Sequence, residues 1–312
     1  MNDKKPLIII AGPTAVGKSS ISIELAKMIK GEIISADSMQ VYKDLDIGTA
    51  KITKEEMQNI PHHMIDILDL SEEFSVSLFK KLFDNIVHEI YKRDHIPILV
   101  GGTGFYIQAV LYGIDFSDDS YDISYRKELE KELKEGKIDE LYEELKKVDL
   151  EYSKIIHKNN HVKLIRALEY YHCTRTPLSK HNEEEKKKES RFNHLFTVIT
   201  DDRNALYERI NKRVDKMIDD GLLSEVKRTV FKNKSSPSLK GIGYHELIPF
   251  PTNDTELNEA IEKIKLNSRH YAKRQLTWFR REKDVVWINR NDFKNNKEIA
   301  EYILSLFKNK EW

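Results

Sequence analysis

The chain has 312 residues, and its 52 Lys and Arg balance its 52 Asp and Glu, so the formal net charge is zero. A neutral total argues against a protein that coats nucleic acid through bulk charge, but it leaves room for a local basic patch. No apolar run approaches the roughly 18 residues of a membrane span, Cys173 is the only cysteine, and the N-terminus passes into a strand without room for a secretory signal, so we expect a cytoplasmic protein without membrane association. Nothing in the sequence demands more than a monomer.

Two kinds of segment alternate in the first third of the chain. Short apolar runs are typical of strands buried in a parallel sheet. They cover residues 7–11, 32–37, 63–69 and 96–100. Helices are expected at residues 19–30 and 75–91, the second with apolar residues at helical spacing. This alternation predicts an α/β fold with a parallel sheet flanked by helices.

The pattern changes at about residue 117. From there to residue 194 we expect only helices, and strand character resumes at residues 195–200. The charged run 183–189 is typical of a solvated face or a mobile connection. The sequence therefore predicts an α/β core built from residues 1–116 and 195–312, with an inserted all-α domain at 117–194. The expected helices and the last strand are residues 126–135, 139–147, 161–171, 203–231 with a break at Gly221, 255–282, and the strand 285–288.

A glycine loop follows the first strand and opens the first helix. It matches the pattern G-x-x-x-x-G-K-[ST] in full, and its backbone N–H groups and the helix N-terminus suit a phosphate. The lysine would bring a full charge to a terminal phosphate oxygen, and the serine hydroxyl would ligate magnesium. The loop comprises Gly12, Pro13, Thr14, Ala15, Val16, Gly17, Lys18 and Ser19.

Two further stretches follow strands and should face the same cleft, because ligands sit beyond the carboxyl ends of parallel strands. Asp37 ends the second strand, where it could be a general base, a magnesium partner or a local acceptor of N–H groups. Gly101-Gly102-Thr103-Gly104 follows the strand 96–100, and its glycines allow either close approach to a ligand or a tight turn. Asp201, after the strand 195–200, is a candidate magnesium residue.

Basic and histidine residues carry three weaker signals. Arg209 and Arg213 lie four apart on one helix, where they could neutralise phosphate charge or pair with Glu208 or Asp215. The pairs His62/His63 and His157/His161 are interpreted as structural, since zinc needs three or four converging ligands.

Residues 268–281, S-R-H-Y-A-K-R-Q-L-T-W-F-R-R, predict a helix with a basic arc for nucleic acid or polyphosphate and an aromatic side for the core. The basic arc comprises Arg269, Lys273, Arg274, Arg280 and Arg281, and the other side Tyr271, Ala272, Trp278 and Phe279.

Together these stretches resemble the tRNA dimethylallyltransferase family. The motifs that carry the resemblance occur in the family's order from residue 12 to residue 280. They are G-P-T-A-V-G-K-S, S-A-D-S-M-Q-V-Y-K-D-L-D-I-G-T-A-K, P-H-H-M-I-D, G-G-T-G-F-Y, V-K-L-I-R-A-L-E, R-V-D-K-M-I-D-D-G-L, K-G-I-G-Y-H-E and Y-A-K-R-Q-L-T-W-F-R. Three positions depart from the usual residue, namely Ser19 for threonine, Lys163 for arginine and His245 for lysine.

The resemblance implies a P-loop fold like that of nucleoside-triphosphate hydrolases, with a helical insertion that grips the tRNA anticodon stem-loop. It implies transfer of a dimethylallyl group from dimethylallyl diphosphate to the exocyclic amine of the adenosine immediately 3′ of the anticodon, with Mg²⁺ as cofactor. Asp37 would be the base, Thr103 would bind the bridging oxygen, and Lys18 and Arg213 would neutralise the diphosphate. The tRNA contacts would come from Asp37, Ser38, Met39, Gln40, Thr103, Arg126, Val162, Lys163, Leu164, Ile165 and Arg166, and from the basic helix through Arg269, Lys273, Arg274 and Arg280.

Two rival functions share part of this pattern. A small-molecule kinase would use the loop, a carboxylate near Asp37 and arginines, but it would not need the basic helix or an insertion of this size. A nucleotide switch is weaker still, because N-K-S-S at Asn233 lacks the Asp of a guanine-reading motif.

Overall fold

The computed structural model describes residues 4–114 and 122–310, and these form two compact units. The larger unit combines Met1–Leu111 with Arg191–Trp312, and the smaller is Tyr112–Ser190. The boundary expected at residues 116–117 lies outside the described residues, and the one expected at residues 194–195 falls inside β5, which begins at Asn193. The Arg191 N–H donates to the Leu111 carbonyl at 2.8 Å, which joins the two connections of the larger unit.

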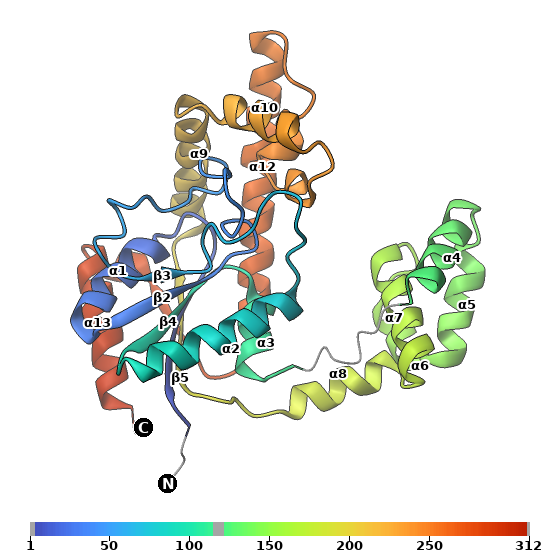
Figure 1. Cartoon of the computed structure of the whole chain (residues 1–312), viewed down its shortest axis with the longest axis horizontal. Helices are drawn as coiled ribbons and strands as arrows, with labels where there is room; N and C mark the ends of the chain where they lie inside the picture. The colour runs from blue at the N-terminus through green and yellow to red at the C-terminus, as the bar shows by residue number, and fades with distance from the viewer. Residues whose placement is uncertain (1–3, 115–121, 311–312) are drawn as a thin grey trace. The chain divides into compact units, whose positions relative to one another are not determined.

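Six parallel strands form the sheet of the larger unit, in the order β3-β2-β4-β1-β5-β6 (Figure 1). This confirms the α/β fold with a parallel sheet. Because the strands are parallel, the carboxyl ends of β1, β2 and β4 lie at one edge, and the stretches that carry the predicted chemistry follow them there. The strands are β1 Pro6–Ala11, β2 Gly31–Ala36, β3 His62–His63, β4 Ile96–Gly101, β5 Asn193–Thr200 and β6 Val285–Asn289.

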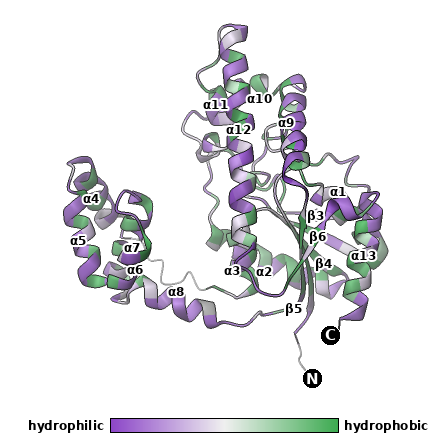
Figure 2. Cartoon of the chain, turned by 180° about the vertical axis from the view of Figure 1, so that it is seen from behind, coloured by the Kyte–Doolittle hydropathy of each residue, from purple (hydrophilic) through white to green (hydrophobic). Residues whose placement is uncertain are grey.

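Helices cover both faces of the sheet. On one face, α1 (Lys18–Ile29) and α13 (Asn296–Asn309) pack together over Ile8 and Ile10 of the central strand β1. On the other, α2 (Val76–Lys92) and α3 (Gly104–Leu111) cover the sheet, and the Phe79 and Tyr106 rings stack with centroids 4.5 Å apart. Figure 2 shows apolar residues along the strands and on the helix sides that face them.

The last third of the chain adds helices beyond the carboxyl ends of the strands. The predicted break at Gly221 is confirmed, since this glycine has φ 98° between α9 and α10. α12 ends at Phe279, three residues before the expected end, so Arg280 and Arg281 follow the helix. The elements are α9 Arg203–Asp219, α10 Leu222–Lys232, η1 Pro237–Lys240, α11 Tyr244–Leu247, α12 Asp254–Phe279 and η2 Arg290–Asp292.

The expected strand at 63–69 was mostly wrong. Only His62 and His63 pair with β2, because Met64 and Asp66 adopt positive φ angles of 66° and 55° that a strand does not tolerate. The His63 ring bonds the buried Glu32 carboxylate at 2.7 Å, and the His62 ring bonds the Ile60 carbonyl at 2.8 Å. The structural interpretation of this histidine pair is thereby confirmed.

The smaller unit is helical throughout its described residues, as expected. Its core gathers Leu129, Leu141, Leu145, Leu164 and Leu168. Its helices are α4 Ile123–Lys134, α5 Ile138–Val148, α6 Leu150–Ile155, α7 His161–Thr174 and α8 Leu178–Lys187. In neither unit is a described helix both long enough and apolar enough to cross a bilayer.

Candidate active site

The loop between β1 and α1 has the backbone of a phosphate-binding loop. Gly12 and Gly17 have φ angles of 146° and 93°, and a Cβ on Gly12 would lie 2.4 Å from the Ile199 carbonyl oxygen. Both positions therefore require glycine. α1 begins at Lys18, so the unpaired N–H groups of its first turn open into a cavity of about 290 Å³ that Gly17, Lys18 and Ser19 line.

Two partly buried basic side chains, Lys18 and Arg213, face this cavity. The pKa of Lys18 is lowered to about 7, first by burial and then by the Arg213 charge, against the opposite effect of the Asp37 charge. The Lys18 ammonium donates to the Pro13 carbonyl at 2.7 Å. Burial also lowers the pKa of Arg213, against the opposite effect of Asp37. Two cations without an adjacent ion-paired carboxylate suit a site for a multiply charged anion.

Arg213 and Arg209 have different environments although they are one helical turn apart. The Arg213 guanidinium donates to the Thr49 carbonyl at 3.2 Å and reaches the cavity. The Arg209 guanidinium instead bonds Asp201 at 2.9 Å, and the Asp201 side chain is fully buried. Arg209 is thus ion-paired, although with Asp201 and not with Glu208 or Asp215. Asp201 was the candidate magnesium residue, and its carboxylate is bonded to Arg209 instead.

Asp37 directly follows β2 and closes a short turn. Its Oδ1 accepts the Met39 N–H at 2.8 Å and the Gln40 N–H at 3.3 Å. The Gln40 side chain then donates to the Thr49 carbonyl at 3.3 Å, beside the Arg213 contact. One carboxylate oxygen of Asp37 therefore holds the turn, and the second is left for chemistry in the cleft.

Gln275 on α12 connects the two glycine stretches. Its amide oxygen accepts the Thr14 N–H at 2.9 Å, and its amide nitrogen donates to the Gly102 carbonyl at 3.0 Å. A Cβ on Gly102 would lie 2.0 Å from that nitrogen, so glycine there is required by a close approach of α12. This role could not be predicted from the sequence, because a glutamine in a basic helix has many other uses.

Tyr271, one turn earlier on α12, is the link to Thr103. Its hydroxyl is hydrogen-bonded to the Thr103 side chain and to Gln275. Burial, together with the nearby Asp37 charge, raises the pKa of Tyr271 to about 12, so the phenol stays protonated at neutral pH. The Thr103 N–H donates to the Ala36 carbonyl at 3.3 Å, so the stretches after β2 and β4 lie together, as expected for the carboxyl ends of parallel strands.

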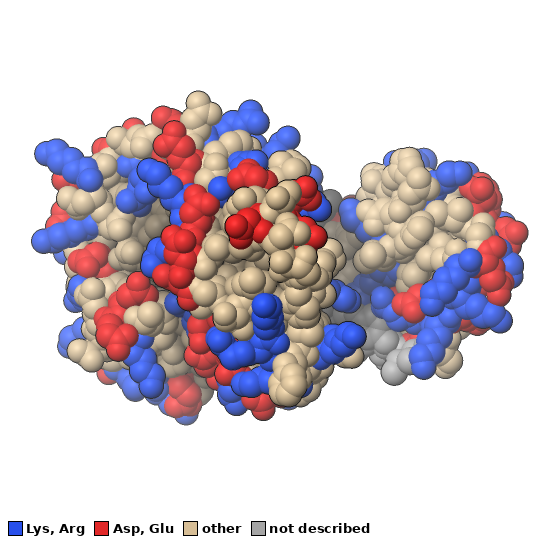
Figure 3. All heavy atoms as spheres, turned by 90° about the horizontal axis from the view of Figure 1, so that it is seen from above, with Lys and Arg blue, Asp and Glu red and all other residues tan. Residues whose placement is uncertain are grey.

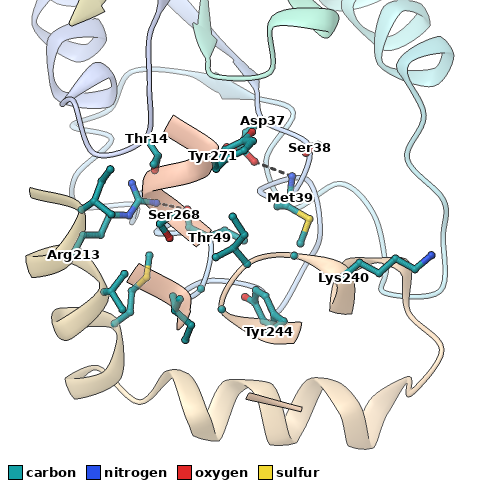
Figure 4. A pocket seen from close by; sticks show the side chains of 18 of the residues that line it. Thr14, Asp37, Ser38, Met39, Thr49, Arg213, Lys240, Tyr244, Ser268 and Tyr271 are labelled. Carbon is teal, nitrogen blue, oxygen red and sulfur yellow. Dashed lines mark hydrogen bonds between the residues drawn. The ribbon is translucent and has the colours of Figure 1, made fainter. Parts of the chain in front are cut away.

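A larger cavity of about 430 Å³ adjoins the phosphate loop (Figure 4). Both cavities are lined by Thr14, Asp37, Arg213 and Tyr271, which form the boundary between them. Beyond these polar residues the wall becomes apolar. The apolar lining is Met39, Ile210, Val214, Met217, Ile242, Tyr244 and Ile264. In Figure 4 the Lys240 amine extends away from the cavity, while the Arg213 guanidinium points into it.

Glu225 holds one wall of this cavity and was missed in the sequence. The residue is 1% exposed, and its carboxylate accepts the N–H groups of Asp46, Ile47 and Gly48 at 2.8–3.0 Å. A Cβ on Gly48 would lie 2.6 Å from the Tyr244 ring. The only signal was an acid on the otherwise apolar side of α10, between Leu222 and Thr229.

The basic part of α12 has two sides. Arg269 donates to Asn211 on α9 at 2.7 Å, so it faces the core of the unit. Lys273 and Arg274 are exposed, and with Arg281 and Trp278 they line a shallow open pocket. Trp278 thus lies with the basic residues, whereas the sequence had placed it on the opposite side. Arg280 is exposed just after the helix. Figure 3 shows basic and acidic side chains interspersed over the larger unit, so this group is local.

Among the predicted RNA contacts on α7 of the smaller unit, some side chains are exposed and others are buried. Val162 is 76% exposed, and Lys163 is also exposed at the start of α7. Leu164 and Ile165 are core residues, 0% and 6% exposed, so their side chains are not available to RNA. The helical period explains this correction, since a run of consecutive residues on a helix cannot all face outward.

Two of the arginines of the smaller unit, Arg126 and Arg166, lie near a buried acid. Arg126 bonds Glu169 at 3.2 Å and Glu130 at 3.0 Å, and Arg166 lies close enough to influence the same carboxylate. Burial raises the pKa of Glu169, and the two arginines oppose that rise. Among the described residues, no three His, Cys, Asp or Glu side chains gather as a metal site. The His157 Nδ1 accepts the Asn159 N–H at 3.2 Å, and the structural interpretation of His157 and His161 stays a prediction.

Comparison with known proteins places this site in a family. The sequence model of the family described as IPP transferase matches residues 40–282. The chain belongs to the IPP transferase family. It is 47% identical over 310 residues to a protein of Lachnoclostridium phytofermentans named tRNA dimethylallyltransferase, covering 98% of this chain and 99% of that one. A protein of the same name from Bacillus cytotoxicus is 47% identical over 302 residues, covering 96% and 95% of the two chains.

Solved members of the IPP transferase family share the fold. The full-length tRNA isopentenylpyrophosphate transferase of Bacillus halodurans is 42% identical and superposes with a TM-score of 0.72, covering 98% of this chain and 96% of that one. A eukaryotic dimethylallyltransferase solved as it acts on tRNA is 30% identical, with a TM-score of 0.85 over 98% of this chain and 80% of its own. The resemblance stated from the motifs is thereby confirmed.

Proposed function

We propose that this protein transfers the dimethylallyl group of dimethylallyl diphosphate to the exocyclic amine of the adenosine immediately 3′ of the anticodon in tRNA, with release of diphosphate. The observation that carries the proposal is the shared boundary of the two cavities. A phosphate loop with two basic side chains, Lys18 and Arg213, meets a larger, partly apolar cavity at Asp37 and Arg213. Relatives that match nearly the whole chain are named tRNA dimethylallyltransferase.

Asp37 is the base in this scheme. An adenine amine is a poor nucleophile because its lone pair is delocalised into the ring, so it gains from losing a proton as the N–C bond forms. The Asp37 oxygen that does not hold the turn takes that proton while the C–O bond to diphosphate breaks. A positioned base of this kind contributes typically about 10²–10⁴ in rate.

The leaving group requires neutralisation as its charge grows. The N–H groups of the loop and first helical turn, Lys18 and Arg213 all converge on the smaller cavity. Thr103 follows Gly101 and Gly102, which line this cavity, and we assign its hydroxyl to the bridging oxygen. In this assignment the loop holds the group that departs, so no water-activating residue is needed.

Magnesium fits the residues present. Mg²⁺ is usually held by one or two protein oxygens together with phosphate oxygens and water, and Ser19 offers one hydroxyl at the loop. When bound, the ion would supply positive charge to the diphosphate oxygens.

The tRNA would approach through the larger cavity and the exposed basic residues. Ser38 and Met39 line that cavity and would contact the unstacked adenine. Lys273, Arg274 and Arg280, with Val162 and Lys163 of the smaller unit, are exposed and suited to the stem-loop. We propose the monomer as the active form.

The test incubates the protein with labelled dimethylallyl diphosphate and unmodified tRNA, and counts label in the RNA. Label in that adenosine, with release of diphosphate, is the expected result. Phosphate transfer from ATP to a small acceptor without label in RNA would instead identify a small-molecule kinase.

A further inference from the structure

The phosphate loop is supported from behind by a residue far from it in the sequence. Arg290 begins η2, directly after β6, and its guanidinium donates to the Val16 carbonyl at 3.1 Å. Arg290 lies outside residues 40–282, the part matched by the family model. The segment after residue 282 therefore reaches the phosphate loop.

The geometry of the peptide bond gives this contact a consequence. No described peptide bond is cis, so the Val16 carbonyl and the Gly17 N–H point in opposite directions across their shared peptide plane. Arg290 draws the carbonyl outward, and the Gly17 N–H must then face the cavity that Gly17 lines. A loop that binds phosphate needs this arrangement, with N–H groups inward and carbonyls bonded behind.

Gly17 and Arg290 are also fitted to each other in space. A Cβ on Gly17 would lie 2.6 Å from the Arg290 Nη1 atom and 3.7 Å from the Asn296 Oδ1 atom. The lack of a side chain at Gly17 thus does more than permit its φ of 93°, because it lets the guanidinium approach the backbone. Arg209, which could otherwise compete for that place, is held by Asp201 at 2.9 Å.

We infer that Arg290 is a positioning residue of the diphosphate site, which fixes the Val16–Gly17 peptide and adds positive charge behind it. Arg290 does not touch the reacting atoms, and the diphosphate is already multiply charged in the bound donor, so most of the stabilisation is present before the C–O bond breaks and only a small part is added as the charge grows. Its loss should raise KM for the diphosphate donor and change kcat much less. The inference rests on the proposed function for the identity of the donor, but not for the binding of diphosphate.

The experiment compares the full chain with Arg290→Met, Arg290→Lys and Arg228→Met. Arg228 is exposed on α10 and serves as the matched control. Calorimetry with inorganic diphosphate gives Kd, and transfer assays give KM, kcat and tRNA affinity. For Arg290→Met we expect Kd for diphosphate and KM for the donor to rise about tenfold, the effect of a hydrogen bond to a charged group. The kcat and the tRNA affinity of Arg290→Met should stay within about twofold of wild type. Arg290→Lys should recover part of the lost diphosphate affinity. Arg228→Met should leave all of these quantities unchanged.

Three outcomes would overturn the inference. They are a diphosphate Kd of Arg290→Met within twofold of wild type, an equal loss of tRNA affinity in that variant, or no diphosphate binding by wild type. If wild type binds diphosphate and Arg290→Met binds it tenfold more weakly, the inference stands. A wild type that then transfers no label to tRNA refutes the proposed function alone.

Discussion

The Tyr244 hydroxyl donates a 2.6 Å hydrogen bond to the Glu225 carboxylate, and both residues are at most 1% exposed. Burial and the adjacent Glu225 charge raise the pKa of Tyr244, so the phenol remains a donor. Since the same carboxylate binds the N–H groups of residues 46–48, it fixes the loop that presents Thr49 to the cavity. Protein stability and site geometry thus depend on one acid.

Glu225→Ala should therefore destabilise the protein by about 2–4 kcal/mol, because the buried Tyr244 hydroxyl and three partly buried N–H groups lose their acceptor. Denaturant unfolding measures this loss. Tyr244→Phe is the matched control, since it keeps the ring and removes one bond, at about 1 kcal/mol. Equal stabilities of Glu225→Ala and wild type would show that the loop is held by other contacts.

Asp37→Asn separates the two roles of Asp37. Asparagine keeps an Oδ1 acceptor for the Met39 and Gln40 N–H groups, so the turn should persist, but it is not a base. We expect turnover to fall by about 10²–10⁴ while tRNA affinity is retained. Single-turnover transfer and a filter-binding assay give the two quantities. Near-normal turnover would rule out Asp37 as the base.

Lys18 should make diphosphate binding depend on pH. With its pKa lowered from 10.5 to about 7, chiefly by burial, the lysine of the empty site is largely neutral at pH 8. A bound anion favours the ammonium form, so binding should take up a proton and weaken as pH rises above about 7. Calorimetry at pH 8 in two buffers of different ionisation enthalpy measures the uptake, and Lys18→Gln provides the background. The same uptake in both proteins would assign the proton elsewhere.

The same pKa shift affects folding in a defined direction. Between pH 7 and 10.5 the unfolded chain binds this proton and the folded chain does not. Stability therefore gains from Lys18 as pH rises through that window.

Neutralising Lys273 and Arg274 together should weaken tRNA binding and flatten its salt dependence. Each lost phosphate contact lowers the slope of log affinity against log salt by about 0.7–0.9. Binding measured from low to moderate salt gives the slope. Lys308→Gln, exposed on α13, is the control. An unchanged slope in the double variant would place the phosphate contacts on another surface.

Local patterns explain which parts of this molecule the sequence could predict. Residues 12–19 carry their own strand–loop–helix context, and Gly221 interrupts a helix by its φ alone, so both were correctly placed. Asp37 and Thr103 followed from the rule that carboxyl ends of parallel strands share an edge. These inferences needed no knowledge of what packs against the residues.

The missed features depend on partners distant in the chain. Gln275 matters because it joins Thr14 to Gly102, and Arg290 because it reaches Val16, and neither has a local signature. Leu164 and Ile165 were grouped with their exposed neighbours because the motif was considered as a run of letters and not as a helix face. The helices α3 and α13 were not expected, although α13 covers one face of the sheet.

The position of β1 has a consequence for biosynthesis. This strand lies between β4 and β5, and its pairing with β5 spans the whole insertion. On the ribosome, the helical insertion with its own core is therefore complete before β5 is translated, while the central strand is still open on one side. Gln275 and Arg290, which contact the phosphate loop, are translated only after β5. The loop should therefore reach its active conformation in one late step of synthesis and not gradually.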